Sequence, residues 1–295
     1  MKPIGVVTDS HSGISQQEAK RLGIMVLPMP FYIDGQCCYE DITLSREEFF
    51  EKLDSGADIS TSQPSPGEVL GLWDKALKEF EKIIYMPISS GLSGSCATAA
   101  ALAQEEPYEG RVIVVDNGRV SALLHRSVLD CLELIEEGYS PEEIKVMLEK
   151  ARDKMVIYVG VDTLEHLKKG GRITPAAALL GTVLNIKPVL KFDVGLLDSF
   201  KKCRGFAKVK KTMIEAMEHD METRFKEARE RGELYLLAAT SASEEETKEW
   251  VNEIRQAFPG MEVMCDNLSL GVSCHIGHGG LGIGCSCRPE RLKTT

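Results

Sequence analysis

Two loops of the sequence concentrate hydroxyl side chains directly before an expected helix. Residues 61–66 are Thr-Ser-Gln-Pro-Ser-Pro, and residues 89–95 are Ser-Ser-Gly-Leu-Ser-Gly-Ser. A helix N-terminus presents unpaired N–H groups and a partial positive charge, so hydroxyls there suit a carboxylate held without a buried cation. Ser65 and Ser93 could instead serve only as N-caps. With Thr8-Asp9-Ser10, these segments are expected at the carboxyl ends of parallel strands, which favours a ligand site there.

The second loop also resembles the strand–turn–helix that carries the nucleophile of serine hydrolases. Gly91-Leu92-Ser93-Gly94 begins the G-x-S-x-G pattern, but Ser95 stands where the last glycine belongs. His275 lies downstream of Ser93, which is the chain order of hydrolases. A serine esterase or acyl-transfer enzyme using Ser93 and His275 is therefore an alternative hypothesis. A P-loop is excluded because no lysine follows the glycines.

The C-terminal region combines glycine with cysteine and histidine. Residues 277–282 fit G-x-G-x-x-G, but too few residues follow for a dinucleotide-binding unit. No C-x-x-C pair is present, and adjacent Cys274 and His275 are expected on opposite faces of a strand. A metal-binding regulatory protein is a third hypothesis. The favoured interpretation is that these cysteines are buried thiols, spaced in step with their apolar neighbours. The candidate ligands are Cys274, His275, His278, Cys285 and Cys287.

Basic residues cluster locally although the chain is acidic, with a formal net charge of −10. This balance argues against sequence-independent binding of nucleic acid or of an anionic membrane. The clusters favour docking to an acidic partner or a phosphate-bearing substrate, although a solvated helix face also explains most of the lysines. Arg172 and Arg204 follow glycine or loop residues and are the better functional candidates. The clusters are Lys168, Lys169 and Arg172, then Lys201, Lys202, Arg204, Lys208, Lys210 and Lys211.

Strand and helix patterns alternate over residues 1–154, which predicts a Rossmann-like parallel sheet covered by helices on both faces. A β-rich excursion is expected near residues 28–60. Four capping boxes mark helix starts, and Pro66, Pro141 and Pro175 are expected in first turns. The boxes are Ser45 with Glu48, Ser65 with Glu68, Ser140 with Glu143, and Ser243 with Glu246.

Residues 155–295 predict a second, α+β domain that closes over the ligand. Residues 186–192 and 196–201 flank a turn at 193–195, which indicates a hairpin. A nearly all-apolar helix over 175–184 is expected to be buried on all sides. The fold class is therefore two-domain α/β.

The composition and the cysteine content of the sequence predict the cellular compartment of the protein. The chain has 295 residues, of which 43% are hydrophobic and 27% charged, as in ordinary globular proteins. No apolar run is long enough for a transmembrane helix, and polar residues at 8–10 come too early for a signal peptide. Nine cysteines without a secretion signal predict reduced, mostly buried thiols in the cytoplasm.

Taken together, these segments resemble the DegV family of bacterial fatty-acid-binding proteins. The resemblance runs over nearly the whole chain, with several long motifs in one order. They are residues 8–10, 61–66, 89–94, 161–164 (Val-Asp-Thr-Leu), 167–173 (Leu-Lys-Lys-Gly-Gly-Arg-Ile), 184–188 (Leu-Asn-Ile-Lys-Pro), Arg204 and 275–277 (His-Ile-Gly).

The resemblance implies a non-enzymatic carrier with a long-chain fatty acid in a buried tunnel between its domains. It implies that hydroxyls of Thr61 and Ser93 hold the carboxylate, that backbone near Ser62 and Gly94 assists, and that His275 lies close by. Arg172 and Arg204 match positions for docking or for the headgroup neighbourhood. The implied partner is a separate fatty-acid kinase that makes acyl phosphate with ATP, and no cofactor is implied besides the bound lipid.

The sequence departs from the family pattern beside His275. Cys274 stands where the family usually has threonine, and His278 stands where it usually has proline. These departures lie next to the expected headgroup site.

Overall fold

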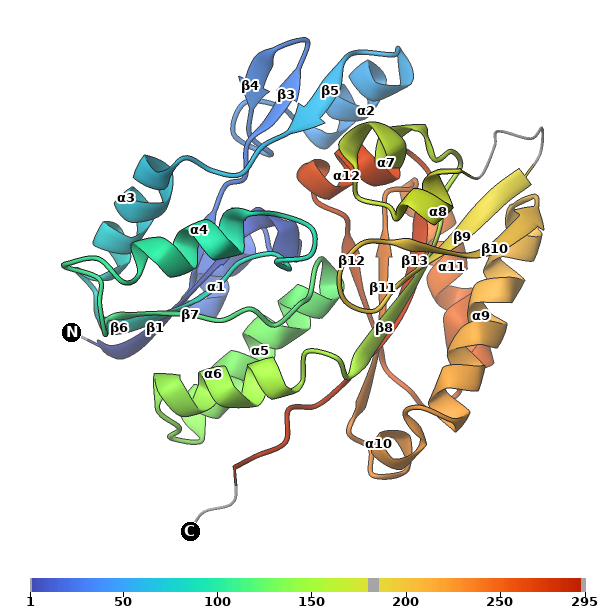
Figure 1. The fold of residues 1–295 in the computed structure, drawn as a ribbon. Helices are drawn as coiled ribbons and strands as arrows, with labels where there is room; N and C mark the ends of the chain where they lie inside the picture. The colour runs from blue at the N-terminus through green and yellow to red at the C-terminus, as the bar shows by residue number, and fades with distance from the viewer. Residues whose placement is uncertain (1, 180–185, 293–295) are drawn as a thin grey trace.

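The computed structural model describes residues 2–179 and 186–292, which form two α/β halves side by side (Figure 1). The first half is built on a parallel sheet of order β2-β1-β6-β7. Its strands are β1 (Lys2–Asp9), β2 (Met25–Leu27), β6 (Phe80–Met86) and β7 (Val112–Val114). Neighbouring residues such as Val6 and Val7 are both buried but belong to different core clusters. The sheet is therefore covered on both faces, as the strand–helix alternation predicts.

Helices cover the two faces of this sheet in separate groups. One face packs against α1 (Gln16–Leu22), α5 (Ala122–Glu136) and α6 (Pro141–Lys150). The other face packs against α3 (Pro66–Ala76) and α4 (Ser95–Leu102). Helix α5 also contributes Ala122 and Leu123 to the core of the second half. This helix therefore joins the two halves, and its N-terminus lies where they meet.

A small antiparallel sheet rises from the first half, in the segment expected as a β-rich excursion. It consists of β3 (Phe31–Ile33), β4 (Gln36–Cys38) and β5 (Ile59–Thr61), with α2 (Arg46–Asp54) packed against it. We call residues 31–61 the β-cap. Its core includes Leu270 and Cys274 of α12 (Leu270–Ile276), so the β-cap is fixed to the second half.

The second half is a six-stranded mixed sheet of order β10-β9-β8-β13-β11-β12. Its strands are β8 (Met155–Gly160), β9 (Ile186–Phe192), β10 (Asp198–Arg204), β11 (Leu234–Thr240), β12 (Val263–Asn267) and β13 (Leu281–Cys287). Helices α9 (Phe206–Glu222), α10 (Lys226–Glu230) and α11 (Glu244–Ala257) cover one face. The opposite face carries a second apolar cluster with α5 and α7 (Glu165–Gly170), and this face is turned toward the first half.

The local start signals are confirmed, because all four capping boxes are formed and the three prolines occupy first turns. The hairpin of β9 and β10 is also confirmed. None of the helices in the described part of the chain is long and apolar enough to cross a membrane.

Two local predictions are wrong. The helix expected over 175–184 was predicted to be buried on all sides, but α8 covers only Pro175–Ala178 and Leu179 is 85% exposed. Residues 180–184 lie outside the described part. Cys274 and His275 lie on helix α12 and not on a strand, because Ser269 caps that helix by accepting the N–H of Val272.

Candidate functional site

A pocket lies between the two halves, and its wall is mostly apolar. Within it, a volume of about 110 Å³ is open to the centre of a water-sized sphere. The mixed sheet supplies much of the wall, and α5, α12 and the loop after β6 supply the rest. The apolar lining includes Ile88, Leu92, Leu123, Ile157, Val159, Phe192, Leu197, Leu237, Leu268 and Ile276.

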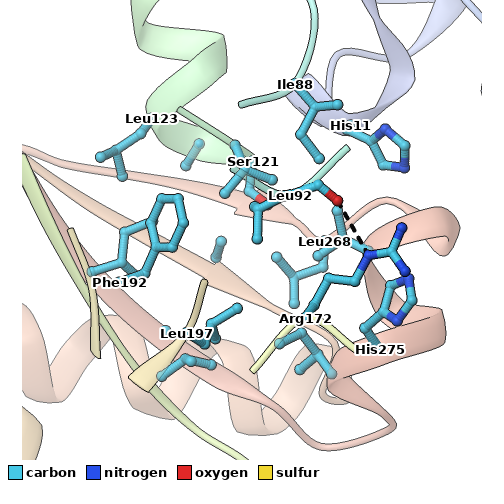
Figure 2. A pocket seen from close by; sticks show the side chains of 18 of the residues that line it. His11, Ile88, Leu92, Ser121, Leu123, Arg172, Phe192, Leu197, Leu268 and His275 are labelled. Carbon is cyan, nitrogen blue, oxygen red and sulfur yellow. Dashed lines mark hydrogen bonds between the residues drawn. The ribbon is translucent and has the colours of Figure 1, made fainter. Parts of the chain in front are cut away.

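Polar side chains gather at one end of this pocket. Figure 2 shows His11, Arg172 and His275 on one side, whereas Leu123 and Phe192 lie on the other. The polar lining residues are His11, Thr61, Ser62, Ser93, Ser121, Arg172 and His275. They come from both halves and from the β-cap, so the polar end forms only when these three parts are assembled.

Thr61 and His275 are joined by a hydrogen bond of 2.8 Å between Oγ1 and Nε2. Burial, with a smaller contribution from the charge of Arg172, lowers the pKa of His275 to about 3, so its imidazole is neutral near pH 7. The other nitrogen, Nδ1, is buried with no hydrogen-bond partner among the described residues. A glycine is required at position 170, because a β-carbon there would overlap the imidazole.

The surroundings of the two ring nitrogens indicate which of them carries the proton of the neutral His275 imidazole. An unpaired buried acceptor is less costly than an unpaired buried N–H, so Nδ1 is assigned the lone pair and Nε2 the proton. His275 then donates to Thr61 Oγ1, and the hydroxyl proton of Thr61 is left to point at a ligand. With this proton assignment, Nε2 of His275 holds the Thr61 hydroxyl oxygen in place.

Arg172 brings a fixed positive charge to the same end. Its Nε donates to the carbonyl of Leu92 at 3.1 Å, and Nη1 donates to the carbonyl of Gly170. The guanidinium is thereby held between the loop after β6 and the end of α7. No described residue accepts a hydrogen bond from Nη2, so this nitrogen can bind an anion.

Ser93 and Ser62 line the pocket from two different loops. Ser93 lies just before α4, where its Oγ accepts the N–H of Ser95 at 3.2 Å and keeps its own proton to donate. The N-cap position itself belongs to Gly94 and not to Ser93. Ser62 donates its hydroxyl to the carbonyl of Gln63.

The other two predicted site residues are not part of the lining. Gly94 is exposed beside the side chain of Gln63, where a β-carbon would approach Oε1 to 3.0 Å. Arg204 is exposed at the end of edge strand β10. The structure thus brings together Thr61, Ser62, Ser93, Arg172 and His275, and their role as ligand-binding groups stays a prediction.

One part of the strand-end argument is wrong. The loops after β1 and β6 do lie at the carboxyl ends of parallel strands. Thr61, however, ends β5, which pairs antiparallel with β3 in the β-cap. It reaches the same place because the β-cap folds over the strand ends and packs on α12.

Sequence reasoning missed His11. It follows Thr8-Asp9-Ser10 directly, in the one-turn helix η1 (Ser10–Ser12), and it is 7% exposed. Asp9 shapes this turn, because its buried carboxylate accepts the N–H of His11 at 3.0 Å and that of Ile88 at 2.8 Å. The sequence signal that could have identified His11 is its position, because it directly follows a polar motif at the end of a strand.

The alternative chemistries find little geometric support. Ser93 forms no hydrogen bond with His275 within the described chain, and no carboxylate there accepts from His275 Nδ1. Over the same residues, no group of three or more His, Cys, Asp and Glu side chains is placed to hold a metal ion. Burial raises the pKa values of Cys274 and Cys285, which keeps both thiols protonated and unreactive.

Comparison with known proteins agrees with the fold and the pocket. The model of an uncharacterised protein family, the DegV family, matches residues 3–287. Protein DegV of Bacillus subtilis is 30% identical over 288 residues, which are 96% of this chain and 99% of that protein. The chain therefore belongs to the DegV family.

Solved structures extend the comparison to three dimensions. A DegV family protein from Thermus thermophilus, whose structure is described under the heading of fatty acid binding, is 32% identical to this chain. It has a TM-score of 0.85 and matches over 97% of this chain and 99% of its own. DegV from Bacillus subtilis, described as a fatty acid binding protein, is 28% identical with a TM-score of 0.83 over 97% and 100% of the two chains. The two-half α/β architecture predicted from the sequence is confirmed.

Proposed function

We propose that this chain binds a long-chain fatty acid in the pocket between its halves. The observation that carries this proposal is one apolar pocket with a polar end formed by Thr61, Ser93 and Arg172. In this arrangement, the carboxylate accepts hydrogen bonds from the two hydroxyls and from the guanidinium, and the acyl chain lies along the mixed sheet. The fatty-acid-binding descriptions of the Thermus thermophilus and Bacillus subtilis relatives support it.

The acyl chain supplies most of the affinity. Burying about 15 methylene groups gains about 0.8 kcal/mol each, or about 12 kcal/mol before the costs of association. Hydrogen bonds to a charged group add about 1.5–3 kcal/mol each at most, since the carboxylate also gives up its water. The apolar wall therefore sets affinity, and the polar end sets the direction in which the ligand lies.

The direct test is extraction of lipid from the purified, denatured protein followed by mass spectrometry. A long-chain acid in about one-to-one ratio is expected without any addition. Absence of lipid together with no binding of added palmitate would overturn the proposal.

The headgroup contacts have a test of their own. Changing Thr61→Ala with Ser93→Ala is expected to weaken binding at least tenfold, because two donors are removed from one carboxylate. Ser55→Ala with Thr223→Ala is the matched control, since both hydroxyls bond only to backbone carbonyls of their own helices. Equal affinity of the two double variants would remove the proposed headgroup site.

We further propose that the bound carboxylate is presented to a separate kinase that forms an acyl phosphate with ATP. Thr61, Ser93 and Arg172 are only half-buried, so the polar end is close to the molecular surface. Exposed Arg204, with its lysine neighbours on β10, provides a basic face for an acidic partner. With palmitate, ATP and a fatty-acid kinase, Arg204→Glu is expected to reduce acyl-phosphate formation while palmitate binding is unchanged. Unchanged formation would exclude this docking face.

A further inference from the structure

His11 is a polar side chain of the pocket to which the proposed function assigns no role. It is 7% exposed and lines the pocket together with Arg172 and His275. Figure 2 shows its ring on the same side as theirs, away from Leu123 and Phe192.

The two nitrogens of the ring have different surroundings. Nδ1 lies 3.6 Å from Oδ1 of Asp9, which is close for two charges but too long for a hydrogen bond, and no described residue accepts from it or donates to it. Nε2 lies over Gly271, another residue of the pocket wall, where a β-carbon would approach it to 2.6 Å. The ring therefore has a carboxylate near Nδ1 and packs on Gly271, where only a glycine leaves room for the imidazole.

We propose that His11 is a further headgroup-binding residue, which takes up a proton when the fatty acid binds and then donates a hydrogen bond to the carboxylate. This inference rests on the proposed function, because it needs an anionic ligand at the polar end. No described residue forms a hydrogen bond with Nε2, and His11 lines the pocket, so this nitrogen is available to a ligand oxygen.

Electrostatics explains why a proton accompanies the ligand. A neutral ring that keeps its proton on Nδ1, toward Asp9, presents a lone pair at Nε2, and this lone pair repels a carboxylate. A proton added to Nε2, taken from solvent, turns the repulsion into a charge-assisted hydrogen bond. The imidazolium then lies between two carboxylates, those of Asp9 and of the ligand.

Other charged groups surround His11 and must be separated in the experiment. Glu40, from the loop after β4, interacts electrostatically with His11 and has Arg46 beside it. Arg172 and His275 face it from the end of α7 and from α12. Helix α5 meets it through Ser121, whose backbone N–H donates to the carbonyl of His11 at 2.8 Å.

The test is titration calorimetry of palmitate binding in two buffers of different ionisation enthalpy at pH 7.5. The difference between the binding enthalpies observed in the two buffers measures the number of protons taken up. For the unchanged protein, uptake approaching one proton is expected. His11→Asn is expected to abolish the uptake and to weaken binding about tenfold or more, as for loss of a hydrogen bond to a charged group. His11→Gln, which keeps a donor without titrating, should recover part of the affinity but none of the uptake.

Two control variants separate the outcomes. His219→Asn, on the exposed side of α9, should change neither quantity, and Glu40→Gln should leave the uptake in place. Unchanged uptake and affinity in both His11 variants would overturn the role of His11 while leaving the fatty-acid proposal standing. No palmitate binding by the unchanged protein would overturn both.

Discussion

The apolar wall and the polar end of the pocket are built from different kinds of structure. The wall comes from paired strands such as β8, β9 and β11, and from α5. The polar end comes from short segments: η1, the end of β5, the loop after β6, the loop after α7 and the seven-residue helix α12. Regular strands supply a continuous apolar surface, whereas single side chains aimed at one point must come from several short segments.

This difference predicts that a bulkier side chain in the wall weakens the binding of a long acyl chain more than the binding of a short one. Ala239 lies on β11, lines the pocket and is only partly buried. Ala239→Phe is expected to exclude three or four methylenes and to weaken palmitate binding by about 3 kcal/mol, or about a hundredfold. Titration of palmitate and of decanoate measures it, and the loss should be smaller for decanoate.

Ala257→Phe is the control for this change, because Ala257 packs on the opposite, α9–α11 side of the sheet. Equal losses for the long and the short acid would show that Ala239→Phe disturbs the fold and not the acyl channel.

The polar end should be most sensitive where backbone and side chain are in close contact. Gly170→Ala places a methyl group into the imidazole of His275, so either the ring or the end of α7 must move. The free energy of unfolding is expected to fall by about 2 kcal/mol, as in other overpacked interiors. Chemical denaturation measures this loss.

Gly71→Ala on α3 is the matched helical control, since a β-carbon there meets nothing within 4 Å. It should be neutral or stabilising, because alanine favours helix more than glycine does. Similar losses at both positions would contradict the close packing of Gly170 on His275.

The same contrast explains what the sequence could predict. Elements with local signals were predictable. They include the helix caps at Ser45, Ser65, Ser140 and Ser243, and strand β11, whose own residues form an apolar run. The alternation of Leu281, Ile283, Cys285 and Cys287 was also correctly read as one strand of small and apolar residues. In these cases, the information lies within a few residues of the chain.

The polar end depended on contacts between distant segments, which no local pattern contains. Thr61 and His275 are separated by 214 positions, and their bond forms because the β-cap packs on α12. The motifs marked both residues but could not show that burial lowers the pKa of His275 or that its Nε2 bonds to Thr61. His11 was missed because its burial depends on Gly271 of α12.

Arg172 places a positive charge inside the pocket, whereas Arg204 places one outside it, so variants of the two residues distinguish these positions. Arg172→Ala is expected to weaken palmitate binding about tenfold, or about 1.4 kcal/mol, because it removes a charged donor from the carboxylate. Arg204→Ala should leave affinity unchanged, since this side chain does not line the pocket. The measurement is direct titration at two salt concentrations. A larger loss in Arg204→Ala would place the carboxylate elsewhere.

The smallest expected effect is the dependence of stability on pH through His275. Its folded-state pKa of about 3 is below the ordinary 6.5, so the neutral ring contributes stability that is fully present above pH 6.5 and lost as the pH falls toward 3. Between pH 6.5 and 5.5 the loss is about 1 kcal/mol. Glu40 acts in the opposite direction, because burial raises its pKa from 4.5 to about 7, so stability falls as the pH rises from 4.5 to about 7 and is constant above that.

The two groups can be separated by denaturant titrations of His275→Gln and Glu40→Gln between pH 5 and 8. His275→Gln should reduce the loss of stability below pH 6.5, and Glu40→Gln should reduce the loss of stability as the pH rises from 5 to 7. A His275→Gln profile parallel to that of the unchanged protein would mean that folding does not shift the pKa of this ring. Burial would then not hold the ring neutral, and the path from His275 through Thr61 to the ligand would have to be abandoned.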